Sequence, residues 1–192
     1  MNQVTMNQAN LYNSPISLLR DCAAVMIPEG STVFLAAGTV VYVTQALGGA
    51  VTVNANGNLA RIAASDVDAL GMEAAALPAE QAQGNADGSV DTALIWAQLS
   101  TCYDPEIPIN IVELGLIYRC EVKTAEGGGN RVEIDLTLTA PGCGMGPFLV
   151  DDVRSKVAQV PNVNDVDIEL VFDPPWNQDM MSEAARLETG MY

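Results

Sequence analysis

The second half of the chain switches between two spacings of its apolar residues. The first helical pattern begins after Asp91, a residue type that caps helices, and ends near Cys102. A second helix is predicted over residues 147–160, where a proline can occupy the first turn. The first apolar face comprises Ile95, Leu99 and Cys102, and the second comprises Leu149, Val150, Val153, Val157 and Val160.

Three stretches alternate apolar with polar residues and predict strands over residues 116–123, 132–138 and 166–172. In the first, the alternation places Tyr118 and Cys120 on the apolar face. The order helix, strand, strand, helix, strand supplies two helices to cover one face of a three-stranded sheet. We therefore predict an α+β fold, a two-layer αββαβ domain with a mixed sheet and a right-handed crossover into its last strand.

The first part of the chain has the pattern of short strands between tight turns. Turn signals recur between residues 25 and 62, and Asn56-Gly57 is typical of a two-residue hairpin. This region predicts a small all-β meander or barrel. Residues 66–90 lose β-branched residues and gain Ala, Glu, Gln and Gly. We predict a β-rich domain over residues 1–65, a partly helical linker over 66–90 and the α+β domain over 91–192.

The net charge of the chain limits the kinds of partner that it can bind. The 192 residues carry 24 acidic and 8 basic side chains, a formal net charge of −16. Without clustered Lys and Arg, binding to nucleic acid or to an anionic membrane is disfavoured. Residues 1–10 are polar, lack the features of a leader, and no apolar stretch is long enough to span a bilayer. A cytoplasmic protein is expected.

Four cysteines and no histidine limit the chemistry. The wide spacing of the cysteines excludes local zinc-finger and ferredoxin patterns, and Ser-His-Asp and Cys-His catalysis have no base. Cys102 and Cys120 fall on predicted apolar faces and are interpreted as core residues. Cys143 differs, because it lies in a turn rich in glycine and proline.

Cys143 is the candidate metal ligand or nucleophile. Its turn follows a predicted strand and precedes a predicted helix, so the thiol is expected at a helix N-terminus, where unpaired N–H groups and the dipole favour a thiolate. The negative charge of the chain opposes that effect. Gly142 and Gly144 leave the thiol little steric cover. The alternative is a small side chain that fills space in a turn.

Asp104 and Glu106 form a second candidate site, because neighbouring prolines stiffen the backbone that carries the two carboxylates. Carboxylates held on such a loop can ligate iron or orient a thiol. The alternative is that Asp104 starts a turn and Glu106 is solvated. Near the C-terminus, Trp176 and the two following methionines are interpreted as cover for the core, ahead of a helix capped by Ser182.

Four short motifs occur in a characteristic order: Asp104-Pro105-Glu106, Val112-Glu113-Leu114-Gly115-Leu116-Ile117-Tyr118, Thr139-Ala140-Pro141-Gly142-Cys143 and Pro174-Pro175-Trp176. With them, residues 91–192 resemble the metal-sulfur cluster assembly factor family that includes PaaD-like proteins. The segments 27–30, 45–49 and 181–187 extend the likeness toward members that serve the SUF system. The resemblance implies an accessory role in iron–sulfur protein maturation, with Cys143 as the characteristic thiol and Asp104 and Glu106 as the acidic-proline motif.

One thiolate cannot supply the four ligands that a cluster normally takes. The cargo, a transient iron–sulfur cluster or iron, would then need a second subunit in a homodimer, the cysteines of a client apo-protein, or a small thiol. We therefore expect a carrier or adaptor, not an enzyme, with the assembly machinery and client proteins as partners. Two alternatives stay open, a thiol-reactive or redox enzyme that uses Cys143 and a pure protein-interaction module.

Overall fold

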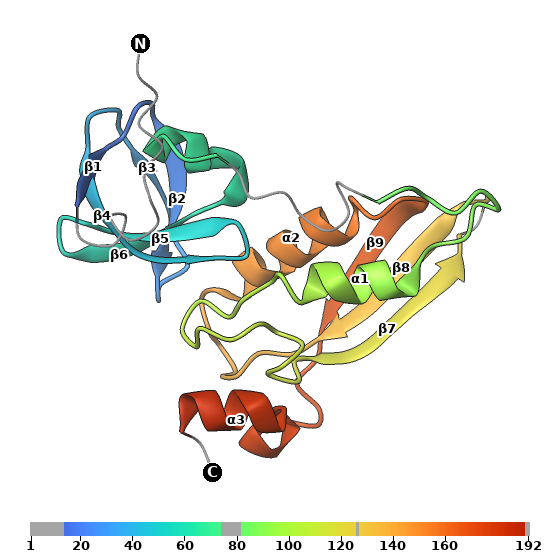
Figure 1. Ribbon diagram of the computed structural model, residues 1–192. Coiled ribbons are helices and arrows are strands. Elements are labelled where there is room, and N and C mark those ends of the chain that lie inside the picture. Colours follow the sequence, from blue (N-terminus) through green and yellow to red (C-terminus); the bar gives the residue numbers. More distant parts are fainter. Residues whose placement is uncertain (1–13, 74–81, 126, 191–192) are drawn as a thin grey trace. The chain divides into compact units, whose positions relative to one another are not determined.

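The computed structural model describes residues 14–73, 82–125 and 127–190 (Figure 1). The chain divides into two compact units, Met1–Ala75 and Ala76–Tyr192, and each is described by itself.

The first unit is built on a six-stranded sheet with the strand order β1-β4-β5-β6-β2-β3, in which all neighbours are antiparallel. Asn56 and Gly57 join β5 to β6 with φ angles of 54° and 90°, so the predicted hairpin is confirmed. The strands are β1 Pro15–Ser17, β2 Cys22–Ile27, β3 Thr32–Leu35, β4 Val40–Leu47, β5 Ala50–Ala55 and β6 Asn58–Ile62.

Both ends of the predicted linker have defined structure. The 3₁₀ helix η2, Ala64–Leu70, buries Val67 and Leu70 in the core of the first unit. At the other end, the side chain of Asn162 donates hydrogen bonds to the carbonyls of Asn85 and Ser89, at 3.1 and 2.8 Å. These hydrogen bonds hold residues 85–89 against the rest of the second unit.

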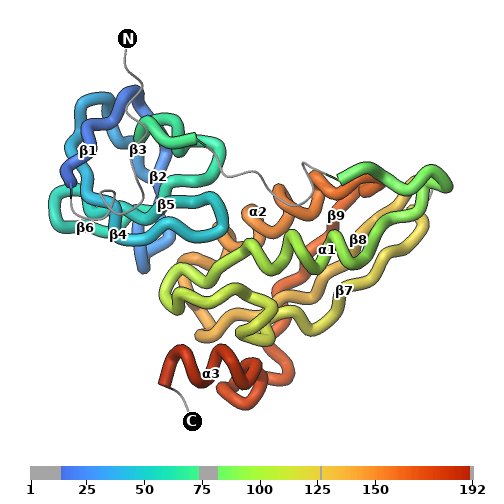
Figure 2. The backbone as a smooth tube through the Cα atoms, in the orientation of Figure 1, coloured from blue at the N-terminus to red at the C-terminus, as the bar shows by residue number. Residues whose placement is uncertain are grey.

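The second unit has the order α1, β7, β8, α2, β9, followed by η4 and α3 (Figures 1 and 2). Strand β8 is central, antiparallel to β7 and parallel to β9. The predicted α+β class and αββαβ order with a mixed sheet are confirmed. The elements are α1 Thr92–Leu99, β7 Ile117–Thr124, β8 Asn130–Leu136, α2 Gly146–Val157, β9 Val163–Leu170, η4 Gln178–Met180 and α3 Glu183–Thr189.

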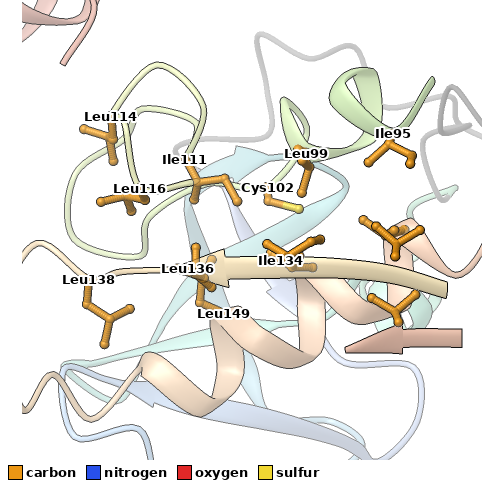
Figure 3. Close-up of a cluster of buried hydrophobic side chains, with 14 of the residues drawn as sticks. Ile95, Leu99, Cys102, Ile111, Leu114, Leu116, Ile134, Leu136, Leu138 and Leu149 are labelled. Atoms are coloured by element: carbon orange, nitrogen blue, oxygen red, sulfur yellow. The ribbon is translucent and has the colours of Figure 1, made fainter. Parts of the chain in front are cut away.

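One face of this sheet is packed under α1 and α2. Along β8, Val132, Ile134 and Leu136 are buried and share a core with Leu99 of α1 and Leu149 of α2 (Figure 3). Asp91 caps α1 as predicted, accepting hydrogen bonds from the N–H groups of the next turn. Lys156 of α2 is almost fully buried, and its Nζ donates to the Thr101 carbonyl after α1 and to Asp152, each at 2.9 Å.

The other face of the sheet is charged. Arg119 donates to Asp135 and Glu133 at 2.8 Å, and Lys123 donates to Glu133 at 2.6 Å. Hydrogen bonds from Lys123 and Arg119 hold the pKa of Glu133 below its usual range, and Arg119 does the same for Asp135. On β9, the carboxylates of Asp165 and Asp167 keep 57% and 56% of their side-chain exposure beside Arg131. This charged face is therefore the solvent-facing side of the sheet.

A β-bulge changes one prediction. Ile117 pairs with Leu136, but Arg119 pairs with Asp135, so Tyr118 is the extra residue. Ile117 takes the place on the core face that the alternation assigned to Tyr118. The Tyr118 hydroxyl instead donates to the Pro174 carbonyl at 2.9 Å. The prediction for Tyr118 was wrong because the bulge interrupts the alternation at this residue, while Cys120 and Val122 beyond it pack against the core as predicted.

The C-terminal segment folds back onto the turn that precedes β7. Met181 is buried and Trp176 packs against the core, as predicted, while Met180 contacts the Tyr118 hydroxyl instead. Gly115 has φ +70°, and a Cβ added there would lie 2.2 Å from the Met180 carbonyl oxygen. Only glycine fits this contact.

Alanine substitutions should show how much the close contact between Gly115 and the Met180 carbonyl contributes to stability. Gly88 also has a positive φ, +79°, but open space around it, so Gly88→Ala should lose about 1–2 kcal/mol of unfolding free energy. Gly115→Ala should lose about 1–3 kcal/mol more, because its Cβ meets backbone. Urea unfolding followed by tryptophan fluorescence measures both, since Trp96 and Trp176 lie in the second unit. Equal losses would contradict the close contact.

Candidate functional site

Cys143 lies in the turn that joins β8 to α2. Its N–H donates to the Ala140 carbonyl at 3.3 Å, and its carbonyl accepts from Gly146 at 3.1 Å. Helix α2 begins at Gly146, and its N-cap is Met145. The cysteine therefore adjoins the helix N-terminus but precedes its first turn, within which the dipole effect is concentrated. The thiol was expected at a helix N-terminus, and it lies two residues before the N-cap of α2.

The turn leaves Cys143 partly open. The residue is half-buried and packs against the core, while Pro141, Gly142 and Gly144 beside it are exposed. Gly142 has φ +83°, and a Cβ added there would meet no atom within 4 Å. Glycine at this position serves the backbone conformation and leaves space next to the thiol.

The other three cysteines are less available. Cys102 is fully buried, and its thiol donates to the Gln98 carbonyl at 3.7 Å, so its predicted place in the core is confirmed. Cys22 is buried in the first unit. Cys120 is half-buried, and burial, with a smaller effect of Glu121, raises the pKa of its thiol to about 11. Cys143 remains the candidate for chemistry.

Asp104 braces its own loop. The residue is 5% exposed, and its Oδ1 accepts hydrogen bonds from the N–H groups of Glu106 and Ile107, both at 2.8 Å. Its N–H donates to the Ile109 carbonyl, and Tyr103 pairs with Asn110 to close the loop. This arrangement matches the turn-starting alternative for Asp104. Glu106 is exposed on the same loop.

Asn110 is a residue that the sequence reasoning missed. Its Oδ1 accepts from the N–H groups of Val112 and Glu113, at 3.1 and 2.9 Å, and so starts the turn before β7. The sequence did contain a signal, because Asn followed three residues later by Glu is the spacing of a capping box.

The three predicted site residues do not form a closed ligand set. Within residues 14–73, 82–125 and 127–190, no three His, Cys, Asp or Glu side chains are placed to hold a metal ion together. Cys143 can offer one soft thiolate ligand, and Glu106 one exposed carboxylate. The described helices include none long and apolar enough to cross a bilayer.

A family model described as iron-sulfur cluster assembly protein matches residues 92–170, from the first residue of α1 to the last of β9. A Fe-S protein maturation auxiliary factor of Porphyromonas gingivalis is 51% identical over 92 residues, which cover 48% of this chain and 84% of that protein. SufT of Staphylococcus aureus, also a Fe-S protein maturation auxiliary factor, is 42% identical over 88 residues, covering 46% and 96%.

Two further matches are shorter or structural. An iron-sulfur cluster carrier protein of Deinococcus radiodurans is 41% identical over 71 residues, covering 37% of this chain and 19% of that protein. A solved domain from Bacillus anthracis, titled as a domain of unknown function, is 35% identical and gives a TM-score of 0.45, with 51% of this chain and 90% of that one covered. The described strands of the first unit lie outside residues 92–170.

Asp104 should stabilise the fold through the hydrogen-bond-accepting oxygen of its side chain more than through its negative charge. Asp104→Ala removes the acceptor of two backbone N–H groups and should cost about 1–3 kcal/mol of unfolding free energy. Asp104→Asn keeps a side-chain oxygen and should lose less than half of that. Urea unfolding of the second unit by tryptophan fluorescence measures both. Equal losses would show that the carboxylate charge, not its oxygen, matters here.

The cysteines should react with iodoacetamide in a fixed order. At pH 8 about one in a thousand Cys120 thiols is ionised, given its pKa of about 11, so its alkylation should be slow and should rise tenfold per pH unit. Cys143 should be labelled first, and Cys22 and Cys102 only after unfolding. Peptide mass spectrometry of time points measures the order. Labelling of Cys120 ahead of Cys143 would contradict this order, which rests on the raised pKa of the Cys120 thiol.

Proposed function

The chain belongs to the iron–sulfur cluster assembly protein family, and we propose that it is an accessory factor in iron–sulfur protein maturation that holds its cargo transiently at Cys143. Two maturation auxiliary factors match over 84% and 96% of their own lengths, which supports the same role for residues around α1 to β9. One observation carries the assignment to Cys143. It is the cysteine in an open glycine turn, while Cys102 and Cys22 are buried and Cys120 has a raised pKa.

The cargo has to be shared. A cluster normally takes four thiolate or related ligands, and Cys143 supplies one. The remaining ligands come from a second copy of the chain, from the cysteines of a client apo-protein, or from a small thiol. Sharing suits transfer, because a cluster held by few ligands of the carrier can exchange onto a protein that offers more.

Glu106 is the proposed second contact, because its carboxylate is exposed on a loop that Asp104 and two prolines keep rigid. Asp104 acts by holding that loop. The partners are the assembly machinery and client apo-proteins, and the described strands of the first unit offer them additional surface. The name of the Deinococcus radiodurans relative supports a carrier over a module that only binds proteins. A cytoplasmic location remains the prediction from sequence.

Anaerobic reconstitution with iron and sulfide tests the proposal. The wild-type protein should develop visible charge-transfer absorption, and Cys143→Ser should lose most of it because the anchoring thiolate is gone. Cys120→Ala is the matched control and should keep the absorption. Glu106→Gln should lower it less than Cys143→Ser does. If Cys143→Ser kept the absorption, the assignment of Cys143 as the cluster ligand would be wrong.

Two further results separate the alternatives. An alkylation rate of Cys143 that already levels off at neutral pH would favour a thiol enzyme, since such an enzyme keeps its nucleophile ionised. Normal maturation of iron–sulfur enzymes in cells that carry Cys143→Ala would favour a pure interaction module.

A further inference from the structure

We infer that residues 174–182, called here the C-terminal strap, position both candidate loops by clamping the turn at residues 112–115. Trp176 and Ser182 are thus positioning residues for Cys143. The inference deepens the proposed function and rests on it, because it concerns how the same thiol is presented. It comes from hydrogen bonds that join segments far apart in the sequence.

The strap fastens the turn at two points. The Trp176 indole donates to the Leu114 carbonyl at 2.8 Å. The Ser182 N–H donates to the Glu113 carbonyl at 2.8 Å, and the Ser182 hydroxyl donates to the Glu113 carboxylate. The same hydroxyl accepts from Ala185 and caps α3. Ser182 therefore couples the start of α3 to the turn.

A third contact joins the strap to the bulge in β7. The Tyr118 hydroxyl donates to the Pro174 carbonyl at 2.9 Å and contacts Met180 Sδ at 3.4 Å. Close to this point the Met180 carbonyl lies against Gly115, with no room for a side chain. The strap thus follows the turn closely along its length.

These contacts satisfy groups that packing has removed from water. Leu114 is fully buried, and a buried carbonyl without a partner costs about 1–3 kcal/mol. Trp176 supplies that partner. The position of the turn therefore depends on the strap as well as on its own side chains.

From the turn, one route leads to the Asp104 loop. Asn110 accepts from Val112 and Glu113 and pairs with Tyr103, the neighbour of Asp104. The adjacent Ile111 N–H donates to the Cys102 carbonyl at 2.9 Å. A shift of the turn would therefore pull on both ends of the acidic loop.

A second route leads to the cysteine turn. The Leu116 carbonyl accepts from Thr137 at 2.8 Å, where β8 has ended and the path to Cys143 begins. Leu138 then packs on Gly146, since a Cβ added to that glycine would lie 2.9 Å from Leu138 Cδ1. Figure 3 draws Leu114, Leu116 and Leu138 toward one end of the core. The turn at 112–115 is thus a common neighbour of both loops.

Substitutions of single hydrogen-bonding groups test the inference. Trp176→Phe keeps a ring but removes the N–H, and Ser182→Ala removes the hydroxyl. Each should change the alkylation rate of Cys143 about fivefold, the factor that corresponds to about 1 kcal/mol for one hydrogen bond. Ser182→Thr keeps the hydroxyl and should restore the wild-type rate. Ser100→Ala, which removes a hydroxyl that bonds only within its own helix end, is the matched control and should change nothing.

The readout separates positioning from stability. Rates are compared at a temperature where circular dichroism shows each variant to be folded, with Cys120 labelling as the internal reference. Should Ser182→Ala not fold, Tyr118→Phe loosens the strap at a partly exposed hydroxyl and should shift the Cys143 rate in the same direction. Unchanged Cys143 rates in folded Trp176→Phe and Ser182→Ala would overturn the inference.

The same variants distinguish this inference from the proposed function. A wild-type protein that takes up no cluster, with strap variants that still alter Cys143 alkylation, would refute the carrier role and keep the positioning role. Cluster uptake that depends on Cys143, together with Cys143 alkylation rates that are the same in every strap variant, would refute the positioning role and keep the carrier role.

Discussion

The apolar face of the three-stranded sheet has to be kept from water, and most of the second unit follows from this constraint. Helices α1 and α2 cover part of it, and loop residues complete the cover at the end that leads to the cysteine turn. Ile111, Leu114 and Leu116 are fully buried there, and each contributes about 1.5–3 kcal/mol, more than the roughly 1 kcal/mol of a single hydrogen bond. Burial of these apolar side chains thus determines where the loops lie, and hydrogen bonds make smaller contributions to their position.

This arrangement explains how an open thiol can still be well placed. Cys143 touches the core on one side and exposed glycine and proline residues on the other. The segments before and after it are fixed. Before it, the Thr137 N–H donates to the Leu116 carbonyl. After it, Gly146 packs against Leu138. A ligand that is anchored at both flanks loses little conformational entropy when it binds metal.

The sequence predicted the order and type of the elements in the second unit, because periodicity records which side of each element is buried. It misplaced Tyr118, since a bulge is a property of strand pairing that one strand alone does not reveal. It identified Asp104 but not its bonds to Glu106 and Ile107, because a carboxylate that caps backbone and one that binds metal share the same residue type. The contact between Ser182 and Glu113 joins residues far apart in the chain, and no local pattern indicates it.

Strand β9 lies at the border of its sheet and pairs with β8 alone in the part of the chain that the structure describes. Two of its carboxylates, Asp165 and Asp167, are exposed on the charged face of the sheet, where they pair with Arg131 of β8. Two copies that approached through these borders would bring like charges together, a device by which proteins discourage growth of one sheet into another. Pairing of two copies through β9 is therefore opposed, so the charges along this strand protect its free edge from extending the sheet.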